Sequence, residues 1–218
     1  MGEAEIDLNK GILTIHSHII TYGEASSEQL SESIRAEIET MWNEPKGMVY
    51  IKGIKCVVAF KITAEWRSAI DEIEILANTN PRNNYFRIEE YAHGNISFVD
   101  GHGCNTGYFK LENLYIGSTT AAHEYGHTLG LEHPADMDYR GKGVPSIMYP
   151  RGTLVDPQYQ YDPAKPAGVT GGTMHPMYRK VFAEDIAALK LERLRFSSEK
   201  AIVGDFTNVF HVNHQEQA

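Results

Sequence analysis

Residues 123–133 read HEYGHTLGLEH, and no other stretch of the chain is as informative. In an α-helix, residues four apart lie on the same face and are separated by about 6 Å along the axis. His123 and His127 therefore predict a helix that presents two imidazoles to one metal ion, with Glu124 beside that face. We expect Glu124 to exchange protons with a water molecule at this site.

A third ligand needs a turn, because a straight helix does not place three side chains around one tetrahedral ion. Glycine adopts the left-handed conformation that ends a helix, so Gly130 predicts such a turn, with His133 in the loop that follows. Three protein ligands with a fourth position open are typical of a catalytic zinc site, whereas structural zinc sites are closed by four Cys or His residues. The regular spacing also argues against three unrelated histidines in a core or at a surface.

Strand-like and helical patterns alternate on the N-terminal side of this motif. Residues 12–22 alternate β-branched and polar side chains, which is typical of a strand. Ser26 and Gln29 form a capping box before apolar residues at helical spacing, so a helix is expected from there to Met41. The other patterns predict strands within 48–63 and at 85–91, 96–99, 108–111 and 114–116, and helices at 66–77, 118–129 and 182–195.

These patterns together predict an α+β fold in a single catalytic domain spanning residues 1–218. An N-terminal subdomain, residues 1–130, contains the zinc helix, and a smaller, irregular C-terminal subdomain, residues 131–218, ends in the last helix. Seven of the nine prolines lie in residues 134–176, where no period is visible. A stretch of this length without regular structure is usually functional in a compact domain.

Composition narrows the classes of partner. A formal net charge of −9 disfavours nucleic acid, because nucleic-acid binders carry basic surfaces. No apolar run approaches the length of a membrane span, so no membrane partner is expected. The first residues show neither the basic start nor the apolar region of a signal peptide. We expect a mature catalytic domain, or a protein exported or delivered by another route, rather than a cytoplasmic protein.

Cysteines and acidic residues outside the motif carry weaker expectations. Cys56 and Cys104 are expected to be free thiols rather than a disulfide. Cys104 is expected in a loop or core, in preference to a role as an inhibitory ligand of the zinc site. Calcium is a second candidate cofactor, with carboxylate oxygens from Asp136, Asp138 and Asp156.

The chain has ten histidines, of which three belong to the motif. Two others, His102 and His175, are expected in loops near the cleft that would hold the zinc site. His211 and His214 are in a polar tail that is expected to be disordered.

The zinc motif and a later methionine turn together resemble the metzincin metallopeptidases. Residues 146–150, Ser-Ile-Met-Tyr-Pro, are the candidate turn. The resemblance implies that Met148 forms a hydrophobic floor under the three histidines. It also implies a twisted, mostly parallel sheet with an antiparallel edge strand above the cleft, where substrate adds as a further strand. Residues 108–111, or the neighbouring strand, are the candidate edge.

Within this clan the resemblance is matrixin- and serralysin-like. The Met-Tyr-Pro run at 148–150 resembles the matrixin turn, and residues 131–136 resemble the serralysins, in which a proline follows the third histidine. Matrixins continue with a Pro-x-Tyr that walls the substrate pocket, and a similar run occurs here at 176–178. The resemblance therefore implies a pocket shaped by Tyr149 and Tyr178, with residues 151–175 as an insertion.

The activity that the resemblance implies is zinc-dependent cleavage of internal peptide bonds, with Glu124 as general base and then general acid. The expected partners are a peptide or protein substrate and a protein inhibitor, and the enzyme itself is expected to be a monomer. One alternative is a zinc-binding interaction module that no longer cleaves. Another is the same chemistry in a toxin or effector domain of a larger delivered protein. The presence of Glu124 argues against the interaction module, which has no chemical need for that residue.

Overall fold

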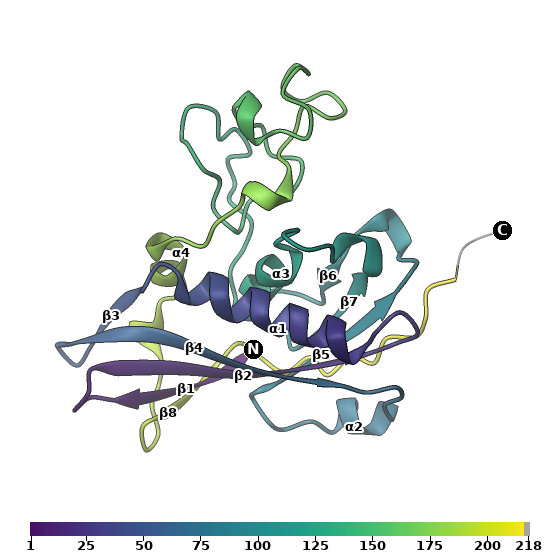
Figure 1. The fold of residues 1–218 in the computed structure, drawn as a ribbon. Helices are drawn as coiled ribbons and strands as arrows, with labels where there is room; N and C mark the ends of the chain where they lie inside the picture. Colours follow the sequence, from purple (N-terminus) through teal and green to yellow (C-terminus); the bar gives the residue numbers. More distant parts are fainter. Residues whose placement is uncertain (216–218) are drawn as a thin grey trace.

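The central strand of the sheet is β2 (Ile12–Tyr22), which alternates buried and half-buried side chains before becoming fully buried. In the computed structural model, which describes residues 1–215, all other strands join it directly or through a neighbour (Figure 1). β2 pairs in parallel with β4 (Ile54–Trp66) along one edge. Its other edge is shared: β1 (Gly2–Asp7) pairs antiparallel with the first half and β5 (Asn83–Glu89) pairs in parallel with the second half.

Further strands extend this arrangement at both ends of the sheet. β7 (Thr106–Lys110) pairs in parallel with β5, and β6 (Phe98–Val99) closes that end as an antiparallel edge strand. At the other end, β3 (Met48–Ile51) is antiparallel to β4. The expected α+β class, with a mostly parallel sheet and an antiparallel edge, is confirmed. The edge strand is β6, the neighbour of the candidate at 108–111.

Two helices that position the site lie together on one face of the sheet (Figure 1). α1 (Glu28–Asn43) turns its buried face, which includes Trp42, toward the core. The Trp42 indole N–H donates to the Ala122 carbonyl of α3 (Thr120–Thr128) at 3.0 Å, so α1 holds α3 directly. Within residues 1–215, no helix has both the length and the apolar composition that crossing a membrane requires.

Several element boundaries differ from the expected ones for local reasons. α1 is capped by Ser27, whose Oγ accepts from the Leu30 backbone N–H at 3.2 Å, while the Ser26 hydroxyl donates back to the Gly23 carbonyl. The helix expected at 66–77 is only α2 (Glu72–Leu76), because β4 continues to Trp66. Residues 114–116 form a bend and turn instead of a strand. Short 3₁₀ turns span His93–Asn95, Leu111–Asn113, Pro157–Tyr159, Pro176–Tyr178 and Leu191–Arg193.

The chain returns to the sheet after its last helix instead of ending there. α4 (Ala183–Ala188) is shorter than the expected helix at 182–195, because Lys190 adopts a left-handed φ of 52° and interrupts it. β8 (Lys200–Val203) then pairs antiparallel with β1. Strands from both ends of the described chain therefore lie side by side at this corner of the sheet.

Residues 204–215 follow the sheet, so the expected disorder of His211 and His214 is wrong. The ring of His214 stacks on that of Tyr108 with 3.9 Å between centroids, and its backbone N–H donates to the Tyr108 hydroxyl at 3.1 Å. The His211 Nε2 lies 3.0 Å from the Asp100 carboxylate. Strand pairing brings Tyr108 and Asp100 to the surface on which this tail lies. The composition of the tail alone does not specify that surface, so it does not predict that the tail is ordered.

Residues 134–178 form an irregular layer above the helices (Figure 1), and we call this segment the loop layer. Main-chain hydrogen bonds between distant turns hold it together. The Leu154 N–H donates to the Met137 carbonyl at 2.8 Å, and the Met174 N–H donates to the Thr153 carbonyl at 3.0 Å. The absence of a sequence period is thus compatible with defined structure, because backbone groups rather than a regular apolar face make most of the connections.

Candidate metal centre

The position of α3 depends on a glycine in the middle of the zinc motif. All nine residues of α3 are buried. A Cβ atom on Gly126 would lie 2.4 Å from the Met148 sulfur and 3.1 Å from the Trp42 ring. Gly126 therefore lets the helix pack against α1 on one side and against the methionine of the later turn on another.

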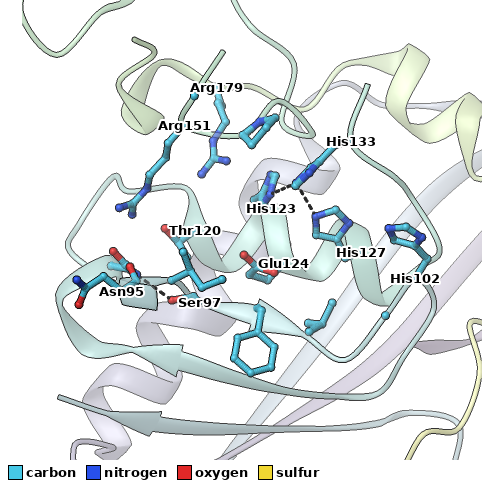
Figure 2. Close-up of a pocket in the computed structure, with 17 residues that line it drawn as sticks. Asn95, Ser97, His102, Thr120, His123, Glu124, His127, His133, Arg151 and Arg179 are labelled. Atoms are coloured by element: carbon cyan, nitrogen blue, oxygen red, sulfur yellow. Dashed lines mark hydrogen bonds between the residues drawn. The ribbon is translucent and has the colours of Figure 1, made fainter. Parts of the chain in front are cut away.

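Three imidazoles converge at the C-terminal half of this helix. His123 and His127 lie one turn apart on α3, and Gly130, with a φ of +98°, turns the chain so that His133 returns to them. The Nε2 atom of His133 lies 3.1 Å from that of His123 and 3.0 Å from that of His127 (Figure 2). Within residues 1–215, this is the one group of three or more potential metal ligands whose donor atoms lie this close together.

The opposite ring nitrogens determine which tautomer each helical histidine adopts. The Nδ1 of His123 lies 2.7 Å from the Ile147 carbonyl, and the Nδ1 of His127 lies 2.7 Å from the Leu131 carbonyl. A carbonyl only accepts, so both Nδ1 atoms carry the proton and both Nε2 atoms present lone pairs to the same point. Such second-sphere carbonyl contacts are those that orient metal-binding histidines.

The donor set fits a zinc ion. Nitrogens bound to a tetrahedral zinc at about 2 Å lie roughly 3.3 Å apart, close to the separations of the three Nε2 atoms. Burial lowers the pKa of His127 to about 4, lowers that of His123 well below its usual range and also lowers that of His133. The imidazoles are therefore neutral at neutral pH, which is the state that binds a metal.

Glu124 lies beside the cluster and faces the same cavity (Figure 2). Glu124 is 6% exposed. Burial raises the pKa of its carboxyl group to about 8, and the positive charges of Arg179 and Arg151 lower that pKa in part. Within residues 1–215, no hydrogen bond engages the carboxylate oxygens of Glu124. A carboxyl group with a pKa near neutrality and no internal partner is suited to accept and then donate a proton.

Met148 packs against the helix that carries two of the three histidines, and its role as a floor under them stays a prediction. It is 3% exposed and packs against Gly126 of α3, and the preceding carbonyl, that of Ile147, accepts from His123. The turn closes through a hydrogen bond from the Tyr149 N–H to the Ser146 carbonyl at 3.2 Å. The Ser146 hydroxyl in turn donates to Asp185 of α4 at 2.5 Å. The turn is therefore anchored from both sides.

The cavity has a volume of about 480 Å³ and reaches from the histidine cluster to the edge strand β6. Tyr149 and Tyr178, the expected pocket residues, are not among the residues that line it. Tyr149 packs on Tyr139 with 4.6 Å between ring centroids, and Tyr178 packs on Tyr159. The wall is formed instead by Pro150, Arg151, Gly152 and Arg179. A turn closed by the Thr153 N–H and the Pro150 carbonyl points the chain between them toward the cavity.

Other histidines and cysteines take the positions that their loops allow. His102 lines the cavity, with its ring 5.7 Å from that of His127, whereas His175 packs on Tyr161 outside it. Cys56 and Cys104 are buried free thiols, as expected. Cys104 does not line the cavity, and burial raises the pKa of its thiol, which disfavours the thiolate that a metal would need.

Calcium binding by Asp136, Asp138 and Asp156 is not supported. All three carboxylates are already held by groups of their own loops, which are Lys142, Arg140 and the backbone N–H of Gly141 respectively. Because each carboxylate has a local partner, the three do not form a common site.

Some cavity residues had no signal in the sequence. Arg151 and Arg179 line the wall, and neither was a candidate site residue. Arg179 directly follows the run at 176–178, but neither spacing nor composition marks it. Only the path of the loop layer brings it to the cavity.

Comparisons with known proteins give a short stretch of sequence similarity and one loose structural likeness. No protein-family model matches the chain. A stretch of 100 residues, 45% of the chain, is 34% identical to Serralysin G of Dickeya chrysanthemi and spans only 20% of that protein's length. Archaemetzincin from Methanopyrus kandleri, a solved structure, is loosely similar, with a TM-score of 0.43 and 12% identity over 81% of this chain and 95% of that one. The stretch shared with a serralysin and the cluster of three histidines together support a fold like that of zinc metallopeptidases.

Proposed function

We propose that this protein is a zinc-dependent endopeptidase of the metzincin type, related to the serralysins and matrixins. The observation that supports this most strongly is the convergence of three neutral imidazole nitrogens beside an unpartnered buried carboxyl group in one cavity. His123, His127 and His133 would hold the ion, which leaves a coordination position free for chemistry. The proposed substrate is a peptide or protein.

Each side chain has a separate task in the proposed reaction. A bound zinc ion supplies Lewis acidity, which polarises the scissile carbonyl and acidifies the attacking water. Glu124 accepts the proton of that water and then donates it to the leaving amine. Met148 supports α3 from below, in the role of the methionine turn.

The edge strand β6 suggests how a peptide would be oriented. Residues 95–99 line the cavity, and β6 pairs with β7 on one side only within the described chain. An exposed strand edge offers main-chain donors and acceptors to an extended peptide. We propose that substrate adds there as a further strand, which carries its backbone past Glu124 and the histidines.

Cleavage of a random peptide library, with and without a zinc chelator, tests the proposal. We expect chelator-sensitive cleavage of internal bonds. Glu124→Ala should lower turnover by about 10²–10⁴-fold, because general acid–base catalysis contributes on that order. Its zinc content, measured by plasma mass spectrometry, should remain close to one ion per chain. Glu132→Ala is the matched control, since this exposed glutamate of the same motif does not line the cavity.

Two results would contradict the proposal. Full activity in Glu124→Ala would remove the assigned role of that carboxyl group. Stoichiometric zinc without cleavage of any peptide in the library would favour the interaction module instead. A His127→Ala variant should lose the metal itself, which separates ligation from proton transfer.

A further inference from the structure

One end of the cavity is cationic. Figure 2 shows Arg151, Arg179 and Thr120 on one side of the histidine cluster, and we call these three residues the arginine end. His102 lies at the opposite side of the cluster. Among the residues that line the cavity, Glu124 is the one carboxylate, and it lies beside the histidines.

Arg179 is held by neutral acceptors and keeps part of its hydrogen-bonding capacity. It is 3% exposed, and its Nε donates to the Thr119 hydroxyl at 2.9 Å. Its terminal nitrogens donate to the carbonyls of Tyr149 at 3.2 Å and Ser118 at 3.3 Å. A guanidinium has five N–H groups, so two remain, one on each terminal nitrogen. A pair of N–H groups on one guanidinium is what a carboxylate accepts in a bidentate contact.

Among the described residues, no acidic side chain forms an ion pair with the arginine end, although the charges of Glu124 and Glu37 act on Arg179 from farther away. Within residues 1–215, neither Arg151 nor Arg179 has a carboxylate within ion-pair distance. Arg151 is half-buried and makes no hydrogen bond with the described residues, although it lines the cavity. A buried guanidinium group is normally paired, so the buried Arg179 beside the half-buried Arg151, with no carboxylate in contact, indicates that a ligand provides one.

Thr120 is the third residue of the arginine end. It is 4% exposed, and its hydroxyl is buried without a hydrogen-bond partner among the described residues. Because that oxygen has almost no accessible surface, Thr120 contributes to the wall of the cavity and is not counted as a contact to a ligand.

We infer that the arginine end binds a carboxylate of the substrate, carried by the residue beside the scissile bond. This inference rests on the proposed peptidase function, which supplies the peptide. In a peptide the carboxylate comes from an aspartate or glutamate side chain or from the C-terminus. Arg179 provides the bidentate contact, and Arg151 adds a second positive charge. The enzyme therefore selects acidic residues, or chain ends, next to the bond that it cuts.

Peptide binding measures this selection without requiring turnover. The protein is the full chain, zinc-loaded, carrying Glu124→Gln to prevent cleavage. The probes are N-terminally fluorescein-labelled hexapeptides of alternating glycine and alanine, with a C-terminal amide and a single Asp or Asn at each position in turn. The unsubstituted hexapeptide is added as free acid and as amide. Fluorescence anisotropy gives the dissociation constants.

We expect Asp at one position to bind about tenfold or more tightly than Asn at the same position, since a buried charge-assisted pair is worth that much. If the C-terminus supplies the carboxylate, the hexapeptide with a free C-terminal acid should instead bind more tightly than its amide by a similar factor. Arg151→Gln should reduce the preference to about threefold or less. Arg195→Gln is the matched control, because this exposed arginine lies outside the cavity and should leave the preference unchanged.

Arg179 is tested with two variants because its contacts also support the loop layer. Arg179→Gln removes the charge, and Arg179→Lys keeps the charge but loses the bidentate geometry. Both should weaken the Asp preference, and Arg179→Lys, together with Arg151→Gln, decides the question if Arg179→Gln does not fold. Equal binding of Asp and Asn at every position, together with equal binding of acid and amide, would overturn the inference. So would an acidic preference that survives both Arg151→Gln and Arg179→Lys.

The two proposals fail in different ways. A protein that cleaves the peptide library without any acidic preference keeps its proposed function and disproves carboxylate selection. A protein that binds acidic peptides through the arginines but cleaves nothing supports carboxylate binding and disproves the peptidase.

Discussion

Two regions meet at the cavity, and they are held in different ways. α3 is buried in the core, with nine buried residues and the Trp42 indole bonded to its backbone. The loop layer contributes the opposite wall through turns that are connected mainly by main-chain hydrogen bonds. Core packing therefore sets the positions of His123 and His127, while the path of the loop layer sets the facing wall. Under the proposed function, catalytic geometry and substrate selection would belong to these two separate regions.

Removing Trp42 is the strongest test of this difference. Trp42→Ala should lower the free energy of unfolding by about 3–5 kcal/mol, because it empties a large core site. It also removes the hydrogen bond to Ala122, so zinc affinity should fall with stability. Denaturant unfolding and zinc titration measure the two effects.

Val155→Ala is the corresponding change in the loop layer, since Val155 is also completely buried. It should cost about 1–2 kcal/mol and leave zinc affinity unchanged. If Val155→Ala weakened zinc binding as much as Trp42→Ala, the two regions would not be separate in the way we describe.

Acid should destabilise the metal-free protein through the helix region. Burial lowers the pKa of His127 to about 4 in the folded state, whereas the unfolded chain takes up this proton near pH 6.5. The contribution of His127 to the free energy of unfolding is therefore fully present above pH 6.5. It is lost as the pH falls toward 4, by up to about 3 kcal/mol. Unfolding of chelator-treated protein between pH 7 and pH 4 measures the loss. His127→Asn should reduce this loss, because the buried imidazole that takes up the proton is absent, while the buried His123 still contributes. A profile insensitive to His127→Asn would contradict the assignment.

Asp185 links α4 to the loop layer, and its loss should have the smallest effect. Its carboxylate accepts from the Phe182 backbone N–H at 2.7 Å and from the Ser146 hydroxyl of the methionine turn. Asp185→Ala should cost about 1–2 kcal/mol, as the loss of a helix N-terminal acceptor usually does. Glu184→Ala, a change at the exposed neighbouring position, should cost less than half as much. Thermal unfolding compares the two variants, and equal shifts in Tm would show that the link to the turn contributes nothing.

The accuracy of sequence-based prediction follows the same division. The helix at 118–129 and the turn at Gly130 were predicted because their signals are local: an i, i+4 spacing and a residue that tolerates a positive φ. β1 and β8 were missed because each is short; β1 pairs with β2 and β8, whereas β8 becomes a strand only by pairing with β1 at the other end of the described chain. The order of the parallel strands likewise depends on contacts that no local pattern encodes.

The pocket shows the limit most clearly. Tyr149 and Tyr178 have the residue type and the relative order expected of a pocket wall, yet both rings pack on other tyrosines. Arg151 and Arg179 carry no motif, and the turns of the loop layer bring them to the cavity instead. Side-chain direction in irregular segments depends on long-range backbone hydrogen bonds, which the local sequence does not specify.

The spacing within residues 123–133 is sufficient, without a structure, to predict the three candidate ligands, the candidate acid–base residue and the turn between them. These features lie within eleven consecutive residues, so helix geometry and the turn that Gly130 permits relate them. The tautomers of His123 and His127, the raised pKa of Glu124 and the arginine end all depend on residues far away in the chain. They follow from burial and from hydrogen bonds across the fold, and these exist only once the chain has folded.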